Sequence, residues 1–337
     1  MKWTTILFLY ISCFSFGQRS DFMAINFKKA DSIAKVYANE SLKNLPVLTH
    51  KLTTYLSTDV EKFRAIYTWV STTIENDYGS YLKTRKKRKK YADNQDALRD
   101  WNNSFTPKVF ENLLKHKKTA CTGYAYLIRE LARLADINCK IIDGYGRTAT
   151  LLLTKNSIPN HSWNAVELDN KWYVCDATWS AGRILITEEG PKFQADYFDG
   201  YFLAEPELFA KNHYPLETKW TLMDTPPSFE QFLLGPVIYK EAFSFSVIPQ
   251  SPQKMHISVL KDKTIPFQLH VQNKLENKNL SIILNRGGVP NKVAPKVTQQ
   301  QNAYILEHTF NTSGRYDVHI TIADTIIATY VVRVKRK

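Results

Sequence analysis

After residue 18, the sequence contains few cysteines and no long apolar run. Cys13 lies in the apolar N-terminal segment, and the other three cysteines of the 337 residues are Cys121, Cys139 and Cys175. Three cysteines are too few for a disulfide framework in a chain of this length. Because their number is odd, at least one thiol stays free or pairs with another molecule. The sequence allows a disulfide between Cys139 and Cys175 but does not require one. No run after residue 18 approaches the roughly 20 apolar residues of a membrane span, so none is expected in the mature chain.

The sequence also lacks internal repeats, a dense cluster of metal-binding side chains and a nucleic-acid recognition motif. We therefore expect no cofactor, no metal and no nucleic-acid partner. The formal net charge is +13, but seven positive charges lie within residues 83–90, KTRKKRKK. Such a run is typical of a solvated loop. The alternative is a contact for an anionic surface polymer, lipid head groups or an acidic substrate.

The N-terminus has the pattern of a secretory signal peptide. Met1 and Lys2 precede the apolar run WTTILFLYISCFSF, and small Gly17 follows it. The run is too short for a membrane span, so we expect residues 1–17 to be cleaved and the protein to be exported to the periplasm, the cell surface or the medium. Acylation of Cys13 is disfavoured, because bulky Tyr10 stands where lipoprotein sites prefer leucine.

The length favours two domains, because a single core rarely grows beyond about 250–300 residues. Residues from Phe22 to about His116 have mostly helical patterns. Thr58 and Glu61 form a capping-box pair before one amphipathic helix, and Thr106 with Pro107 predicts the start of another. We expect an N-terminal helical segment over 18–58.

After the helix that begins near Cys121, the hydrophobic period changes to that of strands. Asp169 and Asn170 predict a tight hairpin between two of them, within an antiparallel sheet packed on the Cys121 helix. Residues 206–236 contain five prolines and predict an irregular linker. The α+β catalytic domain is expected to span 59–236. Alternating strands then predict an immunoglobulin-like β-sandwich over 237–337.

One constellation has the residue types of nucleophilic catalysis. Cys121 stands where a helix should begin, which lowers the pKa of a thiol. His161, at the entrance to a strand, is the candidate base, and Asp176, on the strand paired with it, is placed to orient that imidazole. The predicted hairpin brings His161 and Asp176 toward the same end of the ladder.

The residues around these three resemble motifs of the transglutaminase-like superfamily, with the kyphoscoliosis peptidase and cytokinesis-type branch the most similar. The matching motifs over residues 59–220 are CTGYA from Cys121, HSWN from His161, DATW from Asp176 and YFLAEPELFAKNHYP from Tyr201. Thr119-Ala120 replaces the family's usual Gly-Val before the cysteine, and Ala177 replaces proline.

The resemblance implies a papain-like core in which Cys121 attacks an amide carbonyl, His161 moves protons and Asp176 orients His161. The expected function is a cysteine hydrolase of peptide or isopeptide bonds acting on a protein or peptide through an acyl-enzyme. The alternatives are transfer of the acyl group to an amine and a non-catalytic surface-binding scaffold. Gly123, Trp163 and Trp179 are the expected substrate-cleft residues, Cys175 is expected in the core, and His213 is expected to be structural.

Overall fold

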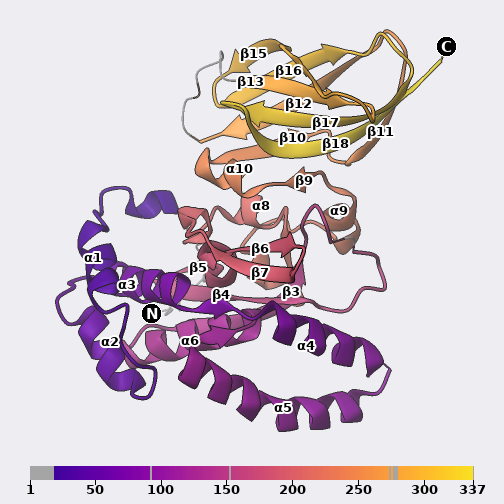
Figure 1. The fold of residues 1–337 in the computed structure, drawn as a ribbon. Coiled ribbons are helices and arrows are strands. Elements are labelled where there is room, and N and C mark those ends of the chain that lie inside the picture. The colour runs from indigo at the N-terminus through magenta and orange to yellow at the C-terminus, as the bar shows by residue number, and fades with distance from the viewer. Residues whose placement is uncertain (1–18, 92, 152, 273–274, 276–279, 337) are drawn as a thin grey trace, which may run out of the picture.

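The computed structural model describes residues 19–91, 93–151, 153–272, 275 and 280–336. The expected signal peptide, with Cys13, lies outside these residues. Figure 1 shows the N-terminal helices at one end of the molecule, a sheet in the centre and a two-sheet sandwich at the other end. None of the helices in the described residues has the combination of length and apolarity needed to cross a membrane.

Four helices pack together on one side of the central sheet and share a buried core. The capping box at the start of one of them is confirmed: Thr58 accepts a hydrogen bond from the Glu61 amide, and the Glu61 side chain accepts one from the Thr58 amide. The buried guanidinium of Arg64 donates a hydrogen bond to Asp31 and also contacts Asp199, which lies 135 residues further along the sequence. It thereby joins the segment around Asp31 to the segment around Asp199. The four helices are α1 (Lys28–Val36), α2 (Leu45–Thr53), α3 (Asp59–Thr73) and α6 (Cys121–Leu134).

The central sheet is antiparallel throughout, with strand order β5-β4-β3-β8. Its hairpin turns at Asp169 and Asn170, whose φ angles of 48° and 61° are those of a type I′ turn, as predicted. Helix α6 packs on β3 and β4, which confirms the expected sheet on the Cys121 helix. The strands are β3 (Cys139–Gly146), β4 (His161–Leu168), β5 (Lys171–Cys175) and β8 (His213–Pro215).

The basic segment 83–90 is helical, and the prediction of a loop is wrong. It forms most of α4 (Tyr78–Lys90), which Asp77 caps by accepting a hydrogen bond from the Ser80 amide. Lysine and arginine are good helix formers, and the positive side chains of the last turn face the negative end of the helix dipole. The expected contact with an anionic polymer stays a prediction.

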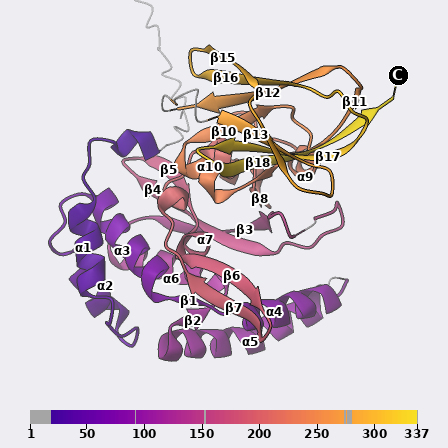
Figure 2. The same ribbon diagram turned by 45° about the horizontal axis from the view of Figure 1, so that its top comes forward.

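The helix predicted to begin at Pro107, with Thr106 as its N-cap, begins twelve residues earlier. Helix α5 (Gln95–His116) is capped by Asn94, and Pro107 lies within it rather than at its first turn. A proline inside a helix removes one backbone hydrogen bond, and here that loss does not end the helix. Figures 1 and 2 both show α4 and α5 side by side at the end of the molecule far from the sandwich.

Short elements connect the sheet to the sandwich. The region 206–236 is less irregular than expected, because it supplies the edge strand β8 and two short helices. The guanidinium of Arg147, at the end of β3, donates to the carbonyls of Leu233 and Gly235 and fixes this connection. The remaining short elements, in chain order, are η1 (Arg19–Phe22), β1 (Glu75–Asn76), β2 (Lys118–Thr119), α7 (Ala177–Ala181), β6 (Gly182–Thr187), β7 (Gly190–Ala195), η2 (Asp199–Tyr201), α8 (Pro206–Phe209), η3 (Thr218–Thr221), α9 (Phe229–Leu234), β9 (Val237–Ile238) and α10 (Lys240–Ser244).

The C-terminal strands form the predicted sandwich. One sheet has the order β10-β12-β16-β15 and the other β11-β18-β17-β13-β14, with β9 added beside β18. One buried cluster fills the sandwich and continues to Trp163 and Val174 of the central sheet. The strands are β10 (Val247–Ser251), β11 (His256–Leu260), β12 (Thr264–Val271), β13 (Leu280–Asn285), β14 (Asn291–Val293), β15 (Lys296–Gln300), β16 (Ala303–Thr309), β17 (Gly314–Ile322) and β18 (Thr325–Lys335). The domain boundaries near residues 58 and 236 stay predictions.

Candidate active site

Cys121 is the first residue of α6, as the sequence predicts. Its side chain is buried but lines a small pocket, and the residue is 7% exposed. The preceding Ala120 provides no side-chain cap to the helix. Cys121 thus lies at the N-terminal end of α6, where the positive end of the helix dipole favours a thiolate.

Gly123 also lines this pocket, but packing on the other side explains why it is a glycine. A Cβ at this position would lie 1.9 Å from Oγ1 of Thr119, far inside contact distance. Thr119 belongs to β2, which pairs with β1 directly before the Cys121 helix. The glycine thus allows the short strand to approach the helix that carries the sulfur.

His161 and Asp176 are in direct contact. His161 is the first residue of β4, and its Nε2 lies 2.7 Å from Oδ2 of Asp176. Both side chains are buried, and the His161 ring stacks on Trp179 with ring centroids 5.2 Å apart. Since Nε2 is bonded to the carboxylate, Nδ1 is the nitrogen available to Cys121. The side chains of Cys121 and His161 also interact, so Cys121, His161 and Asp176 lie together.

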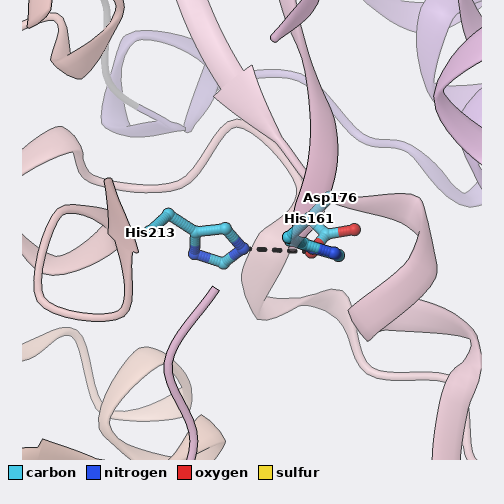
Figure 3. A group of neighbouring side chains, drawn as sticks. All are labelled: His161, Asp176 and His213. Atoms are coloured by element: carbon cyan, nitrogen blue, oxygen red, sulfur yellow. Dashed lines mark hydrogen bonds and ion pairs between the residues drawn. The ribbon is translucent and has the colours of Figure 1, made fainter. Parts of the chain in front are cut away.

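The two carboxylate oxygens of Asp176 accept hydrogen bonds from different groups. Oδ1 caps α7 by accepting hydrogen bonds from the amides of Thr178 and Trp179, at 2.8 and 3.2 Å. Oδ2 accepts from the imidazoles of His161 and His213, the second at 3.0 Å (Figure 3). The helix fixes the carboxylate, and the carboxylate fixes both rings.

His213 is as firmly held as Asp176. It lies in β8, is fully buried, and stacks on the ring of Phe209 at 3.8 Å with an interplanar angle of 10°. Its Nδ1 lies 2.7 Å from Oδ1 of Asn212, within hydrogen-bond distance. We expected His213 to be structural, and the structure places it against the candidate catalytic carboxylate. The motif that contains His213 was visible in the sequence, but pairing of β8 with β3 was not.

The electrostatics favour a thiolate and an imidazolium. Burial by itself raises the pKa of Cys121, but the hydrogen bond and positive charge of His161, the Ser162 amide and the charge of Arg88 outweigh it, so the pKa is lowered. Burial likewise lowers the pKa of His161, but the charge and hydrogen bond of Asp176, with the contact to Cys121, raise it to about 10. Both shifts stabilise the ion pair.

The two imidazoles differ in charge. Burial lowers the pKa of His213 to about 4, although its hydrogen bond to Asp176 opposes this, and the charge of His161 lowers it further. The lowered pKa favours the uncharged form of His213, whose Nε2 faces Oδ2 of Asp176. Burial would raise the pKa of Asp176, but His161 and His213 outweigh it and hold that pKa well below its usual range. The carboxylate is charged, and His161 carries the balancing charge.

His161, Asp176 and His213 are also residue types that bind metals, and their ligand atoms lie within 4.8 Å of one another. Both nitrogens, however, contact the same oxygen at 2.7 and 3.0 Å, which are hydrogen-bond distances. Hydrogen bonds account for the polar atoms of the cluster, so the arrangement does not call for an ion.

The other residues singled out in the sequence lie around the site. Trp163 is buried between Phe209 and the rings of His161 and His213, and Trp179 packs on both imidazoles. Neither tryptophan lines the pocket beside Cys121. They hold the imidazoles in place rather than forming the wall next to the sulfur.

Cys139 and Cys175 are free and buried, so the disulfide left open by the sequence is absent from the structure. Burial raises the pKa of Cys139 to about 12 and raises that of Cys175 well above its ordinary value. These two thiols contrast with Cys121, whose pKa moves the other way.

A cysteine at a helix N-terminus, an imidazole and a carboxylate that holds it define the class of papain-like Cys-His-Asp sites. Residues 47–177 match the family model described as Transglutaminase-like superfamily. This part of the chain is therefore a transglutaminase-like domain, as its motifs indicate.

Known proteins similar to this chain include kyphoscoliosis peptidase of Homo sapiens, 27% identical over 317 residues, which cover 90% of this chain and 43% of that protein. Hillarin of Drosophila melanogaster is 27% identical over 66% of this chain and 26% of its own length. A solved structure, described as that of a TGase, shares 16% identity over 57% of this chain and 39% of that chain, with a TM-score of 0.29. The chain spans less than half the length of these curated relatives.

Proposed function

We propose that this protein is a cysteine hydrolase that cleaves peptide or isopeptide bonds through an acyl-enzyme on Cys121. The observation that supports the proposal is the buried hydrogen bond between His161 and Asp176 beside a cysteine that begins a helix. This is the arrangement that keeps an imidazolium charged and a thiol deprotonated near neutral pH.

In the proposed reaction, the Cys121 thiolate attacks the carbonyl carbon, and the amides at the start of α6 stabilise the oxyanion. The carbon–nitrogen bond then breaks, and His161 gives its proton to the leaving amine. Water attacks the resulting thioester, with His161 accepting a proton from it. The carbon–sulfur bond then breaks and the acid is released, which leaves the Cys121 thiolate beside the His161 imidazolium that holds the proton taken from water.

In this proposal, Asp176 and His213 do not touch the reacting atoms. Asp176 keeps Nδ1 of His161 directed at the sulfur, and His213 keeps Asp176 in place from the side opposite to α7. Asp176 and His213 are therefore positioning residues, and the reacting groups are Cys121 and His161.

The test uses an activated ester that needs no knowledge of the natural substrate. Incubation with p-nitrophenyl acetate, followed by mass spectrometry of the intact protein and its peptides, is expected to show an acetyl group on Cys121 that water then removes. Cys121→Ala should not be acetylated, whereas Cys139→Ala, a matched loss of a buried thiol, should behave as the parent protein. Absence of acetyl-Cys121 would contradict the enzymatic proposal and leave the scaffold alternative.

The same residues serve transfer of the acyl group to an amine. Adding a fluorescent primary amine to a glutamine-containing peptide separates the two outcomes. Hydrolysis leaves the amine unincorporated while the peptide is deamidated or cleaved. Incorporation of the amine that depends on Cys121 would assign the protein to cross-linking instead.

We also propose that the protein is exported, on the sequence pattern of residues 1–17. Expression of the full chain followed by N-terminal sequencing of the protein from the cell envelope or the medium tests this. The expected result is a chain that begins near Gln18, whereas an intact N-terminus in the cytoplasm would contradict it.

A further inference from the structure

A small pocket of about 90 Å³ lies beside Cys121, on the side away from His213. Its floor is the start of α6, and its walls are α4 and α5, two elements that the proposed chemistry does not use. Trp101 and Phe105 of α5 stack at 4.8 Å and form part of the apolar wall. The pocket opens directly onto the sulfur.

The opposite wall is one face of α4. Tyr81, Thr84, Arg85 and Arg88 line the pocket, and their spacing of three and four residues places them on the same side of the helix. The two arginines are the only charged residues among the described residues that line it. The lysines of the segment do not line the pocket, and those at 87 and 90 lie over the ring of Tyr91.

Among the residues that the structure describes, these arginines have no carboxylate partner. Across the described ranges, neither Arg85 nor Arg88 forms a hydrogen bond or an ion pair with another residue. Arg88 is half-buried, and its charge contributes to the lowered pKa of Cys121, which places that charge near the sulfur. Two guanidinium groups without partners at the mouth of an apolar pocket are suited to bind a carboxylate.

We infer that the pocket between α4 and α5 binds an anionic side chain of the acyl donor, so that this protein prefers substrates with a carboxylate next to the carbonyl attacked by Cys121. This inference rests on the proposed function, since it names the substrate class of that site. Arg85 and Arg88 pair with the carboxylate, and Trp101 and Phe105 contact the carbon atoms that carry it.

Two alkylating reagents of similar size test the inference without a known substrate. Iodoacetate carries a carboxylate and iodoacetamide is neutral, and both react with Cys121. The quantity to measure is the ratio of the two rates at Cys121, relative to the same ratio for glutathione. Because the His161 imidazolium also attracts anions, the argument depends on how the ratio changes in variants of the pocket.

In the double variant Arg85→Gln and Arg88→Gln, the rate ratio is expected to fall about fivefold, the effect of an ion pair of roughly 1 kcal/mol. The matched control, Lys86→Gln with Lys89→Gln, removes the same charge from the same helix outside the pocket and should change the ratio less than about twofold. Arg85→Lys with Arg88→Lys should retain the preference, because it keeps both charges.

Peptide-like probes extend the test to the scale of a substrate. Acetyl-aspartyl and acetyl-asparaginyl chloromethyl ketones differ only in the charge of the side chain, and the aspartyl probe should inactivate the parent protein faster. The Arg-to-Gln variant should abolish this difference. Any slowing that follows from a higher pKa of Cys121 without the charge of Arg88 should be equal for the two probes.

Three results would overturn the inference. An unchanged ratio in the Arg-to-Gln variant would remove the pocket as its cause, and an equal fall in the lysine control would assign the effect to overall charge. In both cases rapid labelling by iodoacetamide would leave the proposed function standing. A Cys121 that reacts with neither reagent faster than glutathione near pH 6 would contradict the proposed function itself, and the substrate class with it.

Discussion

On one side of Cys121 lie His161, Asp176 and His213, all of them buried, and on the other lies the α4–α5 wall, where Arg85 reaches solvent. The first side is held by a closed set of hydrogen bonds and stacked rings. The second presents guanidinium groups that have no partner among the residues described. The polar atoms of the buried side are hydrogen-bonded, whereas the guanidinium groups of the exposed side are available to bind an anion.

The buried side is suited to proton transfer, and the exposed side is suited to substrate binding. A proton-transfer group must keep one orientation, and buried hydrogen bonds to a charged carboxylate provide that orientation. A substrate-binding wall must instead exchange water for ligand, which favours charged groups near the surface. Substitutions on the buried side should therefore change the rate for every reagent, and substitutions on the exposed side should change the choice between reagents.

The largest effect is expected from Asp176→Asn. The amide removes the negative charge that holds the pKa of His161 high, so the imidazolium should lose its proton at lower pH. The rate of Cys121 acetylation by p-nitrophenyl acetate should fall on the order of 10³–10⁴-fold, as for loss of the carboxylate in other triads. The alkaline limb of the pH profile should move to lower pH. A fall of less than tenfold, with an unchanged limb, would show that Asp176 does not orient the base.

His213 is expected to have the next largest effect. His213→Leu removes the donor to Asp176 at similar volume, while His213→Gln keeps an amide donor. Hydrogen bonds to charged groups contribute about 1.5–3 kcal/mol, so acetylation should slow about 10- to 100-fold in the leucine variant.

The pH profile distinguishes positioning by His213 from simple packing. His213 lowers the pKa of Asp176, so its loss should move the acid limb to higher pH. The glutamine variant should recover most of the rate and the parent acid limb. If leucine and glutamine variants are equally slow at all pH values, His213 acts through packing alone.

Gly123→Ala tests the junction between the two sides. Alanine normally stabilises a helix interior relative to glycine, but here its Cβ would collide with Thr119. The expected result is a loss of about 1–3 kcal/mol in the free energy of unfolding, measured with urea. Ala125→Gly, two positions further in the same helix, serves as the reference for helix propensity. A Gly123→Ala variant as stable as the parent would mean that Thr119 can move aside.

The smallest effect is expected from Thr58→Ala, far from both sides. It removes the capping box of α3 and should cost about 1 kcal/mol of unfolding free energy. The rate of Cys121 acetylation in the folded protein should stay the same. A slower rate would indicate that the start of α3 is coupled to the site.

Much of the buried side could be predicted from the sequence, because its signals are local. Asp169 and Asn170 specify the turn that sets the register between β4 and β5, and this register places Asp176 near His161. The capping box at Thr58 and the alternation of the C-terminal strands are local signals too, and both elements are present in the structure.

The contribution of His213 could not be predicted in this way. It depends on β8 pairing with β3, strands separated by more than sixty residues, for which no short-range pattern exists. The α4–α5 wall was missed for a different reason. A run of like charges predicts a self-repelling loop, whereas the cap at Asp77 and the favourable helix propensity of lysine and arginine stabilise α4. Pro107 similarly predicted a helix start that the cap at Asn94 places earlier.

The central claim is that His161, held by Asp176, keeps the sulfur of Cys121 ionised at a pH where ordinary thiols are protonated. The most direct measurement is the rate of Cys121 alkylation by iodoacetamide as a function of pH, read by peptide mass spectrometry for the parent protein and for His161→Ala. We predict a midpoint for the parent below that of an ordinary cysteine, and a shift of this midpoint to higher pH in the variant. Identical profiles for the two proteins would contradict the account.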